Sequence, residues 1–72
     1  MDSNEILSLN IRIHMAKNKK NISDLSKATG IARSTLTPLI KGQSKMIKFE
    51  TLDKISNALN IPVDMLFSLK YL

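Results

Sequence analysis

Most of the side chains in this sequence that could bind or react are cationic, and they are concentrated in the middle of the chain. Between positions 17 and 48 the chain carries eight basic residues and one acid, Asp24, a net charge of +7. The flanks together carry three basic and five acidic residues. The central bases are Lys17, Lys19, Lys20, Lys27, Arg33, Lys41, Lys45 and Lys48. This distribution indicates a phosphate-binding surface, although a lysine-rich solubilising surface would carry the same charge.

Other kinds of chemistry have little support. The absence of cysteine excludes a disulfide scaffold, a thiolate zinc site and a cysteine nucleophile. The single histidine, His14, has no second base or nucleophile beside it in the pattern. Gly30 and Gly42 lie twelve positions apart, which does not make a phosphate-binding loop. We therefore expect no catalytic site, no metal or other cofactor and no small-molecule substrate.

Length and composition predict one small globular domain over residues 1–72. Apolar residues make up 43% of the chain and charged residues 24%, so the chain is expected to fold. No apolar run approaches the roughly 20 residues of a membrane helix. The polar, acidic start (residues 1–5) is not typical of a signal peptide. We expect a cytoplasmic protein without a membrane partner and without a second domain for sensing or assembly.

The elements that must position the basic residues are predicted to be helices. A first helix is expected over about residues 4–17, with two apolar stripes that would both be buried. The stripes are Ile6, Leu9 and Ile13, and Leu7, Ile11 and Met15. A second helix begins after the N-cap Asn21, which forms a capping box with Asp24, and ends before Gly30.

Three further helices complete the predicted all-α bundle. They are expected over about residues 33–41, closed by Gly42, over about residues 48–59, and over a short segment after Pro62. The core face of the fourth is predicted to carry Phe49, Leu52, Ile55, Ala58 and Leu59, and that of the fifth Val63, Leu66 and Phe67. Only two residues follow Gly30 before the third helix, so helices two and three must cross steeply as a helix-turn-helix.

The residues from Ile22 through Leu36 to Gly42 resemble the helix-turn-helix of Cro/CI-type repressors. The run Phe49 to Leu52, with Ile55, Ala58-Leu59, Ile61 and Leu66, also resembles that family, so the likeness covers about residues 11–67. It implies a compact five-helix, lambda-repressor-like DNA-binding domain. More narrowly, the chain resembles the modulator-of-repression (antirepressor) proteins of lactococcal temperate phages, which implies a bacterial host cytoplasm.

The resemblance implies a surface for double-stranded DNA, with the third helix in the major groove. Arg33 and Ser34 would meet base edges, and Arg33 could clamp a guanine. The loop after the third helix and the start of the second would contact phosphates. The complete predicted DNA-binding set is Asn21, Ser23, Arg33, Ser34, Thr35, Thr37, Pro38, Lys41, Ser44 and Lys45. Ser34 and Thr35 would equally suit a first helical turn without contacting DNA.

Several positions depart from the family pattern. Ile22 stands where the family usually has a phosphate-contacting Gln, and Ala32 replaces a hydroxyl N-cap at a cost of about 1 kcal/mol. Met15 and Ile40 stand where many members have an ion pair, which predicts an apolar replacement. Pro38 removes an N–H inside the third helix, so this helix is expected to begin late, near Thr35, or to be kinked.

These departures leave two functions open. The protein could act with a phage repressor of its own fold family by direct contact, through Ile22, Arg33, Thr37, Pro38 and Lys41. Leu39, Met46 and Ile47 would make this face more apolar. Alternatively it is an autonomous Cro-like reader of operator DNA, or less readily an antitoxin-type regulator. A homodimer assisted by Leu69, Tyr71 and Leu72 is a further expectation.

Overall fold

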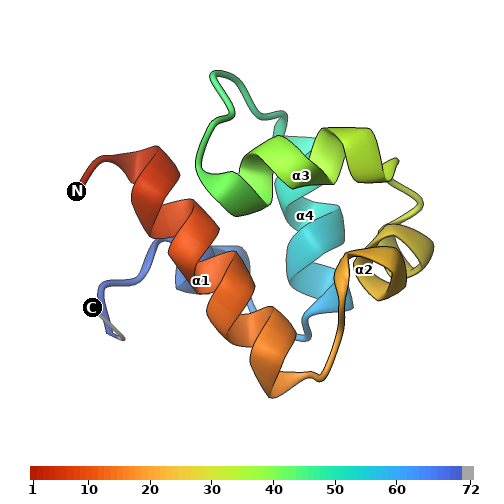
Figure 1. Ribbon diagram of the computed structural model, residues 1–72. Coiled ribbons are helices and arrows are strands. Elements are labelled where there is room, and N and C mark those ends of the chain that lie inside the picture. Colours follow the sequence, from red (N-terminus) through yellow and green to blue (C-terminus); the bar gives the residue numbers. More distant parts are fainter. Residues whose placement is uncertain (71–72) are drawn as a thin grey trace.

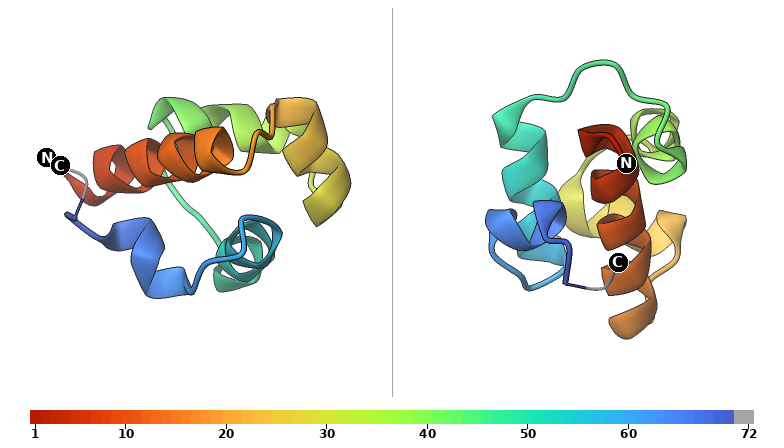
Figure 2. Two further views of the ribbon diagram at one scale, coloured as in Figure 1. Left: turned by 90° about the horizontal axis from the view of Figure 1, so that it is seen from below. Right: turned by 90° about the vertical axis from the view of Figure 1, so that its left-hand side faces the viewer.

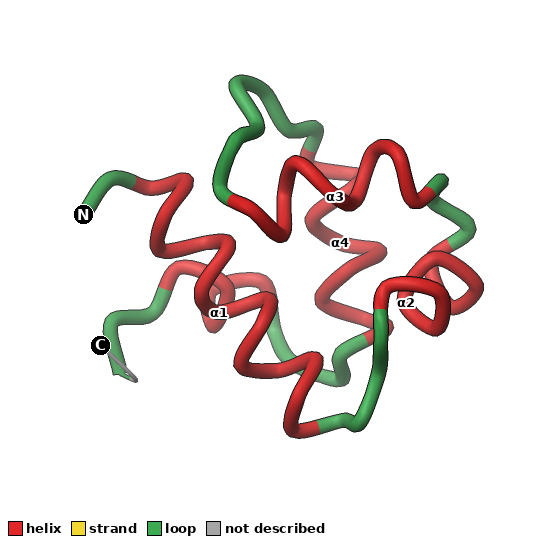
Figure 3. Tube along the Cα trace, in the orientation of Figure 1, coloured by secondary structure: helices red, strands yellow, loops and turns green. Residues whose placement is uncertain are grey.

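The computed structural model describes residues 1–70, which form four α-helices and a final 3-10 helix. These elements are α1 (Ser3–Lys17), α2 (Ile22–Thr29), α3 (Arg33–Lys41), α4 (Phe49–Ala58) and η1 (Val63–Phe67) (Figure 1). Helices and loops account for the whole described chain, without a strand (Figure 3). The all-α class is confirmed, and the turn from α2 into α3 is short, as a helix-turn-helix requires.

The expected count of five α-helices was wrong, because the last element is a 3-10 helix of five residues. Its hydrogen bonds span three residues, from the N–H of Met65 to the carbonyl of Pro62 and from Ser68 to Met65. Such bonds are typical of 3-10 turns, which seldom extend further. The segment still delivers Leu66 to the core, where it is fully buried.

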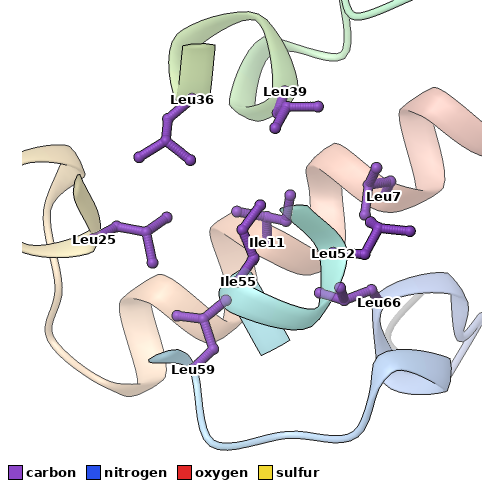
Figure 4. Packing of buried hydrophobic residues seen from close by; sticks show 9 residues of the cluster. All are labelled: Leu7, Ile11, Leu25, Leu36, Leu39, Leu52, Ile55, Leu59 and Leu66. Atoms are coloured by element: carbon purple, nitrogen blue, oxygen red, sulfur yellow. The ribbon is translucent and has the colours of Figure 1, made fainter. Parts of the chain in front are cut away.

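A single core holds these elements together. Its buried apolar side chains come from all five elements: Leu7, Ile11, Leu25, Leu36, Leu39, Leu52, Ile55, Leu59 and Leu66 (Figure 4). Figure 4 shows Ile11 of α1 and Ile55 of α4 near the centre, with Leu36 of α3 and Leu25 of α2 directed toward them. The core thus fixes α3 against the rest of the molecule through Leu36 and Leu39.

Helix α1 buries one face rather than two. Leu7 and Ile11 enter the core, whereas Ile6, Leu9 and Ile13 are only half-buried, so the expected burial of both stripes was wrong. In Figure 2, α3 lies to one side of α1 and η1 and α4 lie to the other, so the core between these elements receives only the side chains of α1 that face it. Met15 and Ile40, the positions of the replaced ion pair, both pack against the core.

Asn10 joins the two ends of the described chain. Its side chain is fully buried, and its Nδ2 donates to the Leu66 carbonyl at 3.0 Å and to the Ser68 carbonyl at 2.8 Å. Both hydrogens of the amide are thereby used. The contact holds η1 along α1 (Figure 2), and nothing in the sequence pattern predicted it.

Local sequence signals set the helix boundaries of the helix-turn-helix. The predicted capping box of α2 is present, with Asp24 N donating to Asn21 Oδ1 at 2.8 Å and Asn21 N to Asp24 Oδ2 at 3.0 Å. Gly30 and Gly42 end α2 and α3 at φ values of 74° and 73°, the left-handed region that favours glycine. A Cβ on Gly42 would lie 3.1 Å from the Ser8 hydroxyl, so α3 ends close against α1.

Pro38 lies inside a helix that begins where the pattern first placed it. Helix α3 starts at Arg33, with Ala32 as an N-cap that makes no side-chain hydrogen bond. The expected late start near Thr35 was therefore wrong. Leu36 and Leu39 are buried on the inner face of α3, one on each side of Pro38 in the sequence. Their packing keeps the backbone helical at the proline.

Phe49 does not join the core, contrary to the sequence expectation. Leu52, Ile55 and Leu59 are buried, but Phe49 is 85% exposed and Phe67 is 39% exposed. Phe49 is the first residue of α4 and extends its apolar stripe one turn beyond the core. The preceding loop leaves this end of α4 uncovered.

We expect Pro38→Ala to stabilise the protein by about 1–3 kcal/mol, because the Ser34 carbonyl would regain a helical N–H donor. Urea unfolding followed by circular dichroism measures the change. Pro62→Ala is the matched control, since Pro62 precedes η1 in an extended conformation with φ −72°. An unchanged midpoint in Pro38→Ala would mean that α3 tolerates the missing hydrogen bond without cost.

His14 predicts an acid-sensitive fold. Its side chain is 4% exposed, and burial, followed by the charge of Lys17, lowers the imidazole pKa from its ordinary 6.5. The unfolded chain therefore binds a proton at His14 more readily than the folded chain does. The free energy of unfolding is highest above about pH 6.5, and it decreases as the pH falls from there toward the lowered pKa of the folded state.

The measurement is urea unfolding at about pH 7.5 and about pH 5, comparing the native chain with His14→Gln. The native chain should lose more stability on acidification than the variant. Glu50, whose pKa is lowered by its hydrogen bond to Lys54, is present in both and cancels from the comparison. Equal losses in the two proteins would contradict this role for His14.

Candidate nucleic-acid interface

The start of α3 presents three polar side chains to solvent. Arg33, Ser34 and Thr35 are all exposed. Arg33 Nη1 donates to the Ser23 hydroxyl at 3.3 Å, which links the starts of α2 and α3. The guanidinium keeps further donors for an external acceptor, since it carries five N–H groups. Arg33 is therefore available to a guanine edge or to a carboxylate.

The two residues on the next turn of α3 are less accessible. Thr37 and Pro38 are half-buried. The Thr37 hydroxyl donates to the Arg33 carbonyl at 2.8 Å, so its proton is already engaged. Their remaining contribution to a contact surface is mainly apolar, through a methyl group and a pyrrolidine ring.

The start of α2 is poorly arranged for a phosphate. The Asn21 side-chain oxygen and the Asp24 carboxylate are both engaged in the capping box. The Asp24 carboxylate is a negative charge in the first turn of α2, and it would repel a phosphate there. Ser23 remains as a hydroxyl partner beside Arg33.

The loop between α3 and α4 is held in place by two polar contacts. Asn4 Nδ2 donates to the Ser44 carbonyl, and the Ser44 hydroxyl donates to the Met46 carbonyl at 2.9 Å. Lys41 and Lys45 are exposed on either side of Ser44. Figure 2 shows this loop, residues 42–48, arching away from the helices.

Two hollows flank this loop. One groove, of about 230 Å³, lies between α3, the loop and the start of α4, and it brings Thr35 and Ser44 together. The other, of about 420 Å³, lies between the start of α1, the loop and η1, and Lys45 lines it together with Asp2 and Phe67. Of the predicted DNA-binding residues, Thr35 and Ser44 thus line one hollow and Lys45 the other.

The apolar residues of this surface are distributed differently from the sequence prediction. Ile22 is half-buried and packs against the core, as does Ile47. Met46, in contrast, is 90% exposed, and Phe49, three positions further along the chain, is 85% exposed. Phe49 was missed as a surface residue because its spacing from Leu52 is that of a core position.

The electrostatics of the surface are dominated by lysines. Lys54 Nζ lies 3.1 Å from Glu50 Oε1, and this hydrogen bond lowers the Glu50 pKa. Within residues 1–70, no carboxylate lies within ion-pair distance of Lys41, Lys45 or Lys48. The three ammonium groups thus retain their charge for an external anion.

In residues 1–70 no three His, Cys, Asp or Glu side chains gather as metal ligands would. No helix in the same range is both long enough and apolar enough to cross a membrane.

Comparison with known proteins identifies the family. Residues 10–70 match the model of the Cro/C1-type HTH DNA-binding domain. The chain belongs to this family. It is also 37% identical, over 59 residues, to the HTH-type transcriptional regulator YozG of Bacillus subtilis, covering 81% of this chain and 70% of that protein. No solved structure matches it significantly.

Membership in the Cro/C1-type family indicates which surface of the chain approaches DNA. These are DNA-binding domains of transcriptional regulators, in which the second helix of the helix-turn-helix enters the major groove. In this chain that helix is α3, with Arg33 at its exposed start. The basic middle of the sequence thus surrounds the element that the family uses to approach DNA.

Arg33→Ala is expected to lower affinity for DNA from the promoter region beside the protein's gene by about 1–3 kcal/mol, because a base contact would be lost. Fluorescence anisotropy at fixed salt measures this change. Arg12→Ala is the matched control, since it removes the same charge from the exposed side of α1. Equal small losses in both variants would assign Arg33 to general electrostatic attraction only.

Proposed function

We propose that this protein is a small phage-type regulator of a switch between lytic and lysogenic growth. It acts together with the phage repressor, in the cytoplasm of the bacterial host, by binding that repressor directly as a modulator of repression. Its basic, repressor-like surface supplies a second contact with DNA of the operator and promoter region.

The observation that carries this proposal is an exposed apolar side chain in the loop that follows the recognition helix. Met46, in the loop where the family approaches phosphates, is 90% exposed. A phosphate backbone offers no apolar surface to such a side chain, whereas protein interfaces are enriched in methionine and aromatic residues. A protein partner therefore accounts for Met46 better than DNA does.

The sequence-derived contact set for the repressor lies around the same helix. It comprises Ile22, Arg33, Thr37, Pro38 and Lys41. Arg33 and Lys41 are exposed at opposite ends of α3 and offer charge. Thr37 and Pro38 offer half-buried apolar area between them, while the packing of Ile22 on the core restricts it to a minor part of the contact.

The second candidate is an autonomous Cro-like repressor that binds its operator without help. The exposed Arg33, with the uncapped start of α3 around it, favours this reading. Base recognition by arginine requires such an accessible guanidinium. A homodimer would then present two recognition helices, and Leu69, 64% exposed, is available to assist it. Tyr71 and Leu72, the other expected contributors, lie outside the described residues.

Titration against promoter DNA with and without the neighbouring repressor separates the two candidates. We expect weak, salt-sensitive binding by this protein alone and a loss or change of the repressor–DNA complex when both are present. Mobility shift at fixed moderate salt, with unrelated DNA as the control, makes the measurement. Tight operator-specific binding by the protein alone, with the repressor complex unchanged, would establish the autonomous repressor instead.

A further inference from the structure

Neither the fold nor DNA binding explains why two large apolar side chains are exposed to solvent. Met46 is 90% exposed and Phe49 is 85% exposed, higher fractions than those of the other large apolar residues that the structure describes. They stand three positions apart, at the end of the loop and at the start of α4. Large exposed apolar surface on a small protein often marks an interaction site.

The local backbone holds Met46 outward. The Ser44 hydroxyl bonds the Met46 carbonyl, and Asn4 bonds the Ser44 carbonyl, so the loop is fixed on both sides of Lys45. Ile47 turns inward and packs against the core, which leaves its neighbour Met46 on the outside. The exposure is therefore built into the fold.

A groove lies beside Met46. It has a volume of about 230 Å³ and runs between α3 and the start of α4. Leu39 and Ile47 give it an apolar floor, and Met46 and Lys48 form part of its lining. Its size suits one apolar side chain of a partner, such as a leucine or a phenylalanine.

The surroundings of the groove determine the charge of a suitable partner. Lys48 lines the groove, and Lys41 and Lys45 are exposed at the end of α3 and in the adjoining loop. No described carboxylate lies within ion-pair distance of these three lysines. The acid nearest to Lys48 in the sequence, Glu50, forms its ion pair with Lys54 and also interacts electrostatically with Lys48 over a longer distance. A cationic rim around an apolar centre is complementary to an apolar side chain flanked by carboxylates.

We propose that this groove, with Met46 in its lining and Phe49 directly after its lining residue Lys48, is the docking site for an acidic segment of the phage repressor that carries one apolar anchor residue. The inference rests on the proposed function and names the part of the surface that carries it. Lysines of the rim orient the segment, and the two apolar side chains cover the anchor and exclude water. The centre of the interface is thus the α3–α4 loop rather than Ile22.

The first test measures the affinity of the full chain for the repressor by calorimetry. Phe49→Ala and Met46→Ala should each lower it by about 30-fold, the effect of removing an interface hot spot. Leu69→Ala is the matched control, because it removes another exposed apolar side chain on a different part of the surface. All three side chains are exposed, so circular dichroism and melting temperature should stay unchanged.

The second test examines the charge of the partner. Lys48→Glu should weaken the repressor complex by about tenfold, because like charges would then face each other. Lys27→Glu makes the same charge change on α2, away from the groove, and should leave repressor affinity unchanged. Equal effects of the two lysine variants would overturn the acidic character assigned to the segment.

The outcomes separate this inference from the proposed function. If the native chain does not bind the repressor, the proposed function fails and the docking site fails with it. If the native chain binds but Phe49→Ala and Met46→Ala bind equally well, only the docking site is overturned. Loss of DNA affinity in these variants without repressor, or a change in their oligomeric state by sedimentation, would assign the surface to DNA or to a second copy instead.

Discussion

The small core imposes the constraint on which the rest of this structure depends. Nine apolar side chains from five short elements fill it, and Ile11 and Ile55 occupy its centre. Each helix packs on the core through only one or two of these residues per turn. An apolar side chain beyond the last turn that contacts the core therefore has nothing to pack against. Phe49 is the clearest case, since it continues the stripe of Leu52 and Ile55 past the edge of the core. A chain of 72 residues can bury only part of its apolar surface. Some apolar side chains therefore stay on the surface, where a partner molecule can contact them.

Much of the fold could be predicted because its signals are local. The Asn21–Asp24 capping box and the glycines at positions 30 and 42 fixed the helix boundaries, and each depends on residues only a few positions apart. The contacts that could not be predicted are those between distant segments. The sequence pattern indicates an ordinary polar helix residue at Asn10, yet its side chain is fully buried and bonds the backbone of η1. The one-sided burial of α1 also escaped prediction, because it depends on where α3, α4 and η1 lie and not on the stripe itself.

The candidate site was predictable to a similar degree. The location of Arg33 at the exposed start of α3 followed from the short turn after Gly30. The division of the basic residues between two hollows did not, since it results from the path of the α3–α4 loop and its tether to Asn4. Periodicity also assigned Phe49 to the core, because a spacing of three is the same for a buried residue and for one just beyond the core. Only the placement of the neighbouring elements distinguishes the two.

The Asn10 contact has a consequence for how the chain folds. It joins residues 56 and 58 positions apart, so almost the whole chain must be arranged before the amide can reach both carbonyls. Closing such a long loop costs more entropy than forming the α2–α3 turn, whose contacts are near in sequence. We expect the helix-turn-helix to assemble early and η1 to dock late. The segment that completes the core is therefore also the part that can detach first, while the recognition helix keeps its place.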